Sequence, residues 1–177
     1  MRNVDLSLVP LERLERLAAR PAGVRPEDQI WEALRELCTT RMGRADLGEA
    51  VRLRWARLAA TAVTRKYAHA PDDDARKHVD VVRLRAASIK ALGPEPGDPD
   101  RDPELLFRYL TEKCAMTYDE VAAETPRWRE LPTAEILRLR RVKNMLTAAL
   151  GVEQHLPSGS PVRAAAEKWL ALLPDLP

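Results

Sequence analysis

Apolar residues recur at intervals of three to four positions along most of the chain, and this spacing predicts amphipathic α-helices. The expected helices cover residues 10–20, 26–42, 45–70, 75–92, 104–114, 117–124 and 133–150, with a last helix after the polar loop 158–161. The segment 45–70 is apolar on more than one side, which is typical of a central helix. We therefore expect an all-α fold, a multi-helix bundle of about seven to eight helices.

Polar residues mark several of the expected helix ends. The acidic run Asp72–Asp74 is suited to cap the helix that follows it, because Asp is a preferred N-cap. Thr117 and Glu120 have the spacing of a capping box, and Gly151 is suited to the position just after a helix. Glycine occurs only 7 times and aromatic residues make up 5% of the chain, which argues against a β-sandwich or barrel.

One segment has the composition of a linker. Residues 93–103 contain four prolines, two glycines and a cluster of acids, so they cannot continue a helix. We expect this Pro/Asp-rich linker to join two lobes, an N-terminal helical lobe over 1–92 and a C-terminal helical lobe over 104–177.

The apolar stripes of two successive helices predict a shared core. The helices 45–70 and 75–92 are separated only by a turn at Pro71, so we expect them to pack antiparallel. The residues expected to be buried together are Trp55, Leu58, Val79, Val82 and Ile89.

Charge is balanced overall but segregated along the chain. Lys and Arg number 29 against 27 for Asp and Glu, and the net charge of +2 excludes a histone-like basic binder and an acidic tail protein. Residues 41–90 hold 12 basic and 6 acidic groups, 91–124 hold 3 and 9, and 125–143 hold 6 and 2. The near-neutral total therefore hides local basic regions.

The sequence offers little for catalysis or for a cofactor. No P-loop, dinucleotide fingerprint or nucleophile elbow is present, and no histidine pair has helical metal-ligand spacing. His69 and His78 fit better as surface histidines beside an aspartate-capped helix start, and Cys38 and Cys114 as small buried hydrophobes. We expect a non-enzymatic protein with no catalytic residues, no metal and no cofactor.

Targeting signals are also missing from the sequence pattern. The first residues lack the apolar core of a signal peptide, and no stretch approaches the roughly 18 uncharged apolar residues of a membrane span. We expect an intracellular, cytoplasmic protein with no membrane partner.

Three segments of the C-terminal half carry a resemblance. They are LLFRYL at 105–110, MTYDEVAAE at 116–124 and ILRLRRVKNML at 136–146. Together they resemble the helix-turn-helix of sigma-factor region 4, which implies a supporting helix, a short helix, a turn and an Arg-rich recognition helix that reads the DNA major groove. The connection 125–132 has eight residues, longer than the usual turn of roughly 3–4, so we expect a different angle between the two helices.

The basic residues of this region are the candidate nucleic-acid-binding residues. Cations hold phosphates, and an arginine can bond guanine O6 and N7 together. Arg138 and Arg141 lie one helical turn apart, so we expect them to point the same way. The full candidate set is Arg127, Arg129, Arg138, Arg141 and Lys143.

A second basic group lies on the helix 45–70. Its members are spread around the helix, which favours solvation or pairing within the protein: Arg52, Arg54, Arg57, Arg65 and Lys66.

Two functions are favoured, and a third, a small enzyme with an unrecognised site, is weaker. The first is a nucleic-acid-binding protein, such as a transcription or complex-assembly factor with a helix-turn-helix-like segment. The alternative is a protein–protein interaction module, an adaptor or small subunit that docks on a larger partner or on a second copy of the chain. Exposed tryptophans are typical anchors of such interfaces, and the candidates are Trp31, Trp55, Trp128 and Trp169.

Overall fold

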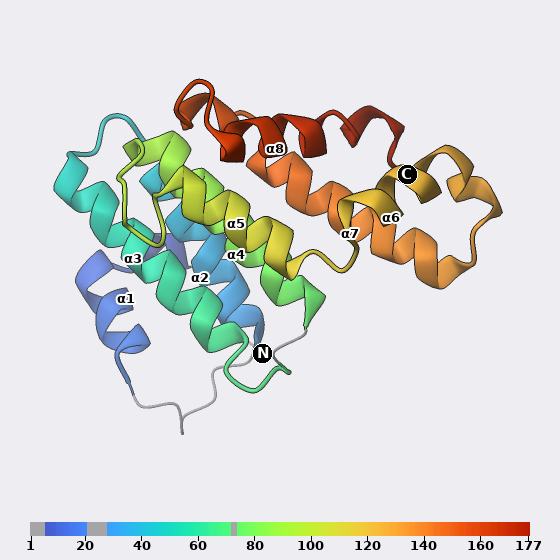
Figure 1. Cartoon of the computed structure of the whole chain (residues 1–177). Coiled ribbons are helices and arrows are strands. Elements are labelled where there is room, and N and C mark those ends of the chain that lie inside the picture. Colours follow the sequence, from blue (N-terminus) through green and yellow to red (C-terminus); the bar gives the residue numbers. More distant parts are fainter. Residues whose placement is uncertain (1–5, 21–27, 72–73) are drawn as a thin grey trace. The chain divides into compact units, whose positions relative to one another are not determined.

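Helices account for all the regular secondary structure of the computed structural model, which describes residues 6–20, 28–71 and 74–177 (Figure 1). Within these ranges there are eight α-helices and four short 3-10 helices, labelled η, and no strand. The predicted all-α helical bundle is confirmed. No helix in the described ranges is both long and apolar enough to cross a membrane.

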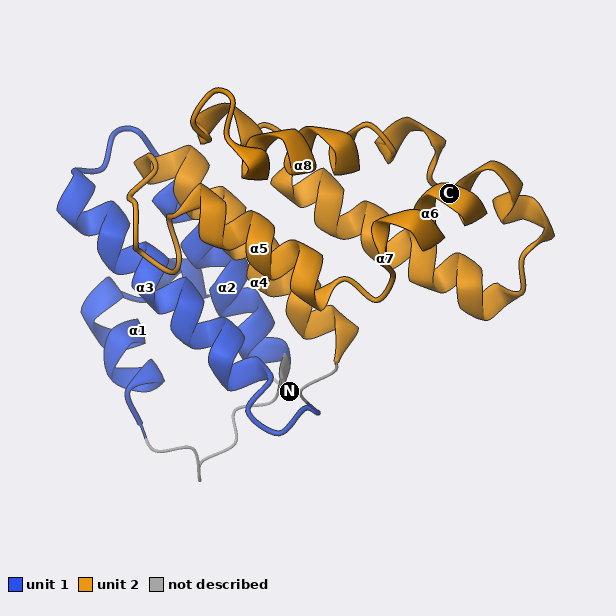
Figure 2. Ribbon diagram, in the orientation of Figure 1, with its two compact units in different colours: residues 1–72 blue, residues 73–177 orange. Residues whose placement is uncertain are grey.

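The chain divides into two compact units, residues 1–72 and 73–177 (Figure 2). The predicted boundary at 93–103 differs from this division, because that segment joins α4 to α5 inside unit 2. The reason is the packing of α4, whose apolar face lies against α5 and α7, so the helix before the segment shares a core with the helices after it.

The segment 93–103 is ordered by its own polar contacts. The amide N–H of Gly97 donates to Asp102 Oδ2 at 2.7 Å, and Arg101 pairs with Glu95 and Asp98. The side chain of Arg101 is only 14% exposed. Asp102 also accepts from the amide N–H of Glu104 at 2.8 Å and so caps α5. The residue types that break helices here build a defined loop, which the linker interpretation did not anticipate.

Unit 1 is built on the pairing of α2 with α3, and α1 also packs against α3. Its elements are η1 (Leu6–Leu8), α1 (Leu11–Ala18), α2 (Asp28–Met42) and α3 (Glu49–Lys66). The expected start of the second helix at Pro26 lies outside the described residues. The third helix begins later than predicted, because Gly48 is its N-cap and the residues before it form a turn. The fully buried side chains include Leu14, Leu34, Cys38 and Met42.

Unit 2 contains the rest of the helices around one hydrophobic cluster. They are α4 (Ala75–Leu92), α5 (Pro103–Lys113), α6 (Tyr118–Glu124), η2 (Thr125–Glu130), α7 (Thr133–Ala149), η3 (Glu153–His155), α8 (Pro161–Leu170) and η4 (Leu173–Asp175). The cluster draws on five of these helices, with Val82, Leu106, Val121, Leu139 and Trp169 among its members.

The expected core residues are all buried, but they belong to different units. Trp55 and Leu58 are buried in unit 1, whereas Val79, Val82 and Ile89 belong to the cluster of unit 2. On α8, Ala166 and Trp169 form the buried face, and Ala165 is exposed.

Three predicted helix-end signals, at Asp74, Thr117 and Gly151, are confirmed, whereas the third helix ends at Lys66, before the expected residue 70. The Asp74 side chain accepts from the amide N–H of Arg76 at 2.9 Å, while Asp72 and Asp73 lie outside the described residues. Thr117 and Glu120 form both halves of the capping box. Gly151 has a φ of +88°, a conformation in which glycine avoids the steric cost of a side chain.

Candidate nucleic-acid interface

The candidate interface is carried by α6, η2 and α7, and local polar contacts fix the first of these. The amide N–H of Thr117 donates to Glu120 Oε2 at 2.7 Å, and the amide N–H of Glu120 donates to Thr117 Oγ1 at 3.3 Å. The Glu120 carboxylate accepts from the amide N–H and from the hydroxyl of Thr117, and these two hydrogen bonds hold the pKa of Glu120 below its ordinary value. The buried hydroxyl of Thr125 donates to the carbonyl of Val121 at 2.6 Å and so fixes the end of α6.

The eight-residue connection between α6 and α7 is mostly helical. Residues 125–130 form η2, which is interrupted at Arg127 by a φ of −115° and a ψ of 18°. Only Leu131 and Pro132 are extended, and α7 begins at Thr133. The predicted order of supporting helix, short helix and basic helix is therefore present, with a 3-10 helix where a short turn was expected from the resemblance.

Two of the five candidate cations have a structural partner. Arg138 pairs with Glu135 at 2.7 Å and donates to the carbonyl of Ala115 at 2.8 Å. Lys143 donates to the carbonyl of Leu176 at 2.7 Å, which ties the segment after α8 to α7. These side chains make contacts within the fold, so Arg138 is held by partners that Arg141 lacks in the described ranges.

The other three candidates are exposed. Arg127 and Arg141 form no salt bridge with a residue that the structure describes. Arg129 lies over the indole of Trp128, with its guanidinium carbon 4.8 Å from the ring centroid. Since Arg127 and Arg129 lie on η2 and Arg141 lies on α7, the free cations come from two adjacent elements.

The outward face of α7 adds residues that the sequence analysis did not select. Leu139, Val142 and Leu146 are buried, so the opposite side of the helix faces away from the core. This outward face carries Leu137, Arg140, Arg141, Asn144 and Thr147, all of them exposed. Arg140 has no ion-pair partner among the described residues. The helical phase of the buried stripe was the signal that could have identified Arg140.

The second basic group behaves differently, because most of its side chains are engaged within unit 1. Arg52 donates to the carbonyl of Met42 at 2.9 Å, and Arg54 pairs with Glu15 at 2.7 Å. Arg65 donates to the carbonyls of Ala18 and Arg20, and Lys66 pairs with Glu32 at 2.6 Å. This agrees with the expected pairing within the protein.

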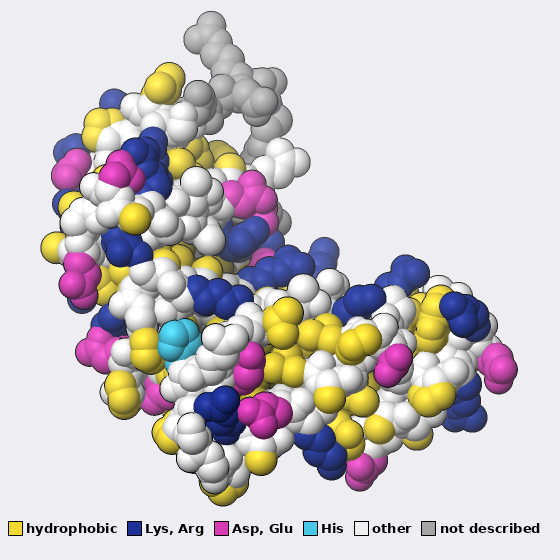
Figure 3. All heavy atoms as spheres, turned by 90° about the horizontal axis from the view of Figure 1, so that it is seen from above, with side chains coloured by type: hydrophobic (Ala, Val, Ile, Leu, Met, Phe, Trp, Pro, Cys, Tyr) yellow, Lys and Arg dark blue, Asp and Glu magenta, His cyan; other side chains and the backbone are white. Residues whose placement is uncertain are grey.

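Figure 3 shows how charged side chains are distributed over one face of the molecule. On the face drawn in Figure 3, Lys and Arg side chains lie beside acidic and hydrophobic ones. A binding role therefore has to be argued from individual cations and their partners.

The histidines and cysteines were also candidates for chemistry. His69 is exposed as expected, but His78 is 8% exposed and its Nδ1 lies 2.8 Å from the hydroxyl of Tyr109, so the expected surface position of His78 is wrong. Cys38 and Cys114 are both free, and burial raises the pKa of the Cys38 thiol to about 12. No group of His, Cys, Asp or Glu within the described ranges is arranged to hold a metal ion.

Neither a known protein family, nor a curated protein, nor a solved structure matches the chain. Function must therefore be inferred from the side chains of this chain alone.

Proposed function

We propose that unit 2 binds nucleic acid through the outward face of α7 together with the arginines of η2, and that the protein acts as a binding factor rather than an enzyme. The observation that carries this proposal is the pair Arg140 and Arg141, both exposed and both without an ion-pair partner among the described residues. Unpaired guanidinium groups keep all their donors for phosphate oxygens or base edges.

The neighbouring residues support the same proposal. Asn144 and Thr147 are exposed on the same face of α7, and their amide and hydroxyl groups are suited to base edges and phosphates. The only acid of α7 is Glu135, which is neutralised by Arg138. Arg127 and Arg129 on η2 supply further positive charge next to this helix. A transcription or complex-assembly factor would use such a surface.

The test is a titration of labelled duplex DNA and of single-stranded RNA of the same sequence, at about 50 and 200 mM salt. We expect the Arg140→Ala/Arg141→Ala variant to lose about tenfold or more in affinity. The slope of its log K against log salt should flatten by about 0.9 for each phosphate that the variant no longer neutralises.

The matched control is Arg13→Ala/Arg57→Ala, which removes the same charge from exposed arginines of unit 1 that also lack an ion-pair partner among the described residues. Binding by the control should equal that of the wild type. Equal losses of nucleic-acid affinity in both variants would show that net charge alone, and not the face of α7, determines binding. An absence of binding by the wild type at low salt would refute the proposal.

A second function, docking on a protein partner, is favoured by one observation on the same helix. Leu137 is 47% exposed and Leu150, just after the helix, is 51% exposed, so this part of the surface carries apolar as well as basic side chains. The tryptophans support docking less than expected, since Trp31, Trp55 and Trp169 are buried and only Trp128 stays half-exposed. Loss of partner capture in Leu137→Ser, with nucleic-acid binding retained, would favour this function.

A further inference from the structure

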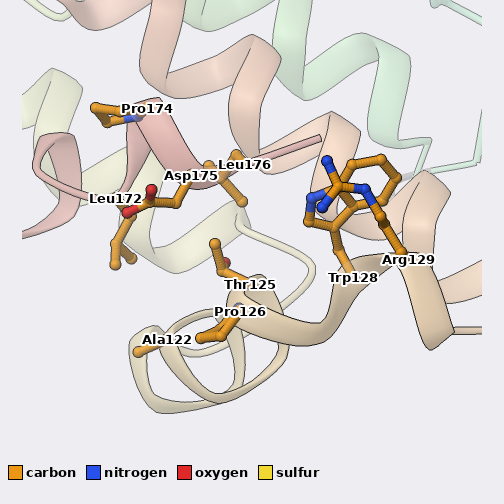
Figure 4. A pocket seen from close by; sticks show the side chains of 9 residues that line it. All are labelled: Ala122, Thr125, Pro126, Trp128, Arg129, Leu172, Pro174, Asp175 and Leu176. Atoms are coloured by element: carbon orange, nitrogen blue, oxygen red, sulfur yellow. The ribbon is translucent and has the colours of Figure 1, made fainter.

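Unit 2 contains an open pocket between η2 and the C-terminal segment that includes η4 (Figure 4). Its volume is about 630 Å³, which lies within the range of ligand-binding sites. Trp128 and Arg129 form one end in Figure 4, and Leu172, Pro174 and Asp175 lie at the other. The proposed function does not use this pocket as a whole.

One end of the pocket presents a pre-oriented cation. The guanidinium of Arg129 stacks on the indole of Trp128 and forms no salt bridge with a described residue. Stacking covers the flat face of a guanidinium and leaves the N–H donors at its edge free. These donors bind a carboxylate or a phosphate in two-pronged geometry.

The opposite end presents an anion. Asp175 is exposed, and its carboxylate forms no salt bridge within the described part of the chain. Between the two charged ends lie the apolar side chains of Pro126 on one wall and Leu176 on the other, with Thr125 beside them. The pocket therefore has a cationic end, an apolar middle and an anionic end.

Both walls are fixed by buried contacts. Leu176 is 3% exposed, and its carbonyl accepts from Lys143 at 2.7 Å. Thr125 on the opposite wall is 3% exposed and donates to the carbonyl of Val121. A pocket between two anchored segments keeps its shape without an occupant, which lowers the entropic cost of binding.

The exposure of the lining residues indicates the kind of occupant. Pro126, Arg129, Pro174 and Asp175 are exposed, so an occupant would keep one side in water. Small molecules usually bury most of their surface in an enclosed site, whereas extended peptides bind in open grooves. We propose that this pocket binds an extended peptide segment of a partner protein, with an acidic side chain at Arg129, apolar side chains in the middle and a basic side chain at Asp175.

The experiment uses the full chain and defined synthetic peptides. Two blocked hexapeptides carry a glutamate and an arginine separated by two leucines, one in each chain direction, since either direction could match the groove. Binding is followed by the NMR signal of the Trp128 indole N–H, which the Trp128→Phe variant identifies. At least one direction should shift this signal, and replacing its glutamate or its arginine by glutamine should weaken binding about three- to tenfold.

Charge pairing is tested with two variants of the protein. Arg129→Gln should weaken the binding of the peptide that carries glutamate, but not the binding of the peptide in which glutamine replaces that glutamate. In the same way, Asp175→Asn should weaken the binding of the peptide that carries arginine, but not the binding of the peptide in which glutamine replaces that arginine. Binding that ignores these replacements, or no shift with either direction, would overturn the proposal.

The outcome is separable from the proposed nucleic-acid binding. Arg140 and Arg141 do not line the pocket. Their double variant should therefore bind the peptides as the wild type does, and Asp175→Asn should leave nucleic-acid binding unchanged. If DNA shifts the NMR signal of the Trp128 indole N–H and neither peptide does, the pocket belongs to the nucleic-acid surface and peptide binding is refuted.

Discussion

Helices α3 and α7 are both rich in arginine, yet most cations of α3 contact other residues of unit 1, whereas two arginines of α7 lie exposed on its outward face. On α3, Arg54 reaches two glutamates of α1, and Arg65 donates to carbonyls at the end of the same helix. On α7, Arg140 and Arg141 lie on the outward face without an ion-pair partner among the described residues. The difference shows that the charge of a helix says little about binding until the partner of each cation is known.

The physical reason is the availability of acceptors. A helix end leaves its last carbonyls without partners, and the side chain of Arg65 satisfies two at the end of α1. On α7 the same role falls to Arg138 and Lys143, which hold the carbonyls of Ala115 and Leu176. The cations left over on α7 are the ones that remain available for a ligand.

The largest expected effect is a loss of stability when a leucine on the buried face of either helix is truncated. Leu58 of α3 is 3% exposed and Leu139 of α7 is 0% exposed. Truncating either to alanine should lower the free energy of unfolding by about 2–5 kcal/mol, through reduced burial and the cavity left behind. Chemical denaturation measures this, with Leu137→Ala, at an exposed site of α7, as the control. A loss as large in the control would show that the face of α7 is assigned wrongly.

The next effect tests whether the ion pairs of Glu32, one with Arg35 on the same helix α2 and one with Lys66 of α3, stabilise unit 1. Hydrogen bonds from Arg35, and then from Lys66, lower the pKa of Glu32 from its ordinary 4.5 to about 2. Because the folded-state pKa lies below the unfolded one, this carboxylate stabilises the fold fully above about pH 4.5. The stabilisation is lost as the pH falls towards 2.

Glu32→Gln should therefore cost about 1–2 kcal/mol at pH 7, a figure reduced for solvent screening because the side chain is a third exposed. The difference from the wild type should shrink as the pH is lowered from 5 to about 2. Urea unfolding across this pH range measures it, and a difference that stays constant with pH would contradict the role of the charge.

A smaller effect separates the engaged cations of α7 from the free ones. Lys143→Met removes the hydrogen bond to the Leu176 carbonyl but keeps the apolar stem, and should cost about 1 kcal/mol of stability. Its nucleic-acid affinity should keep the salt dependence of the wild type. A flatter salt dependence of nucleic-acid binding with unchanged stability would show that Lys143 binds nucleic acid and does not hold the fold.

The smallest effect on stability is expected at the residues proposed to bind nucleic acid. Arg140→Ala/Arg141→Ala should stay within about 0.5 kcal/mol of the wild type, because both side chains are exposed and alanine is a good helix former. Thermal unfolding followed by circular dichroism checks this. A substantial loss of stability would mean that these arginines are structural, as on α3, and the contrast between the two helices would fail.

Sequence alone determined the features that depend on residues close together in the chain. The apolar spacing predicted the eight helices, and the cap at Asp74, the capping box at Thr117 and the glycine at 151 are local in the same way. Each depends on interactions within about one helical turn, which the sequence states directly.

Only the tertiary structure decided which cations are free, where the chain divides and where a pocket forms. Arg138 is engaged by a carbonyl 23 positions away, and Lys143 by one 33 positions away. The loop 93–103 lies inside unit 2 because α4 packs with α5 and α7, and the pocket exists because the C-terminal segment returns to η2. Such contacts join residues that are distant in sequence, and periodicity carries no information about which distant partners meet.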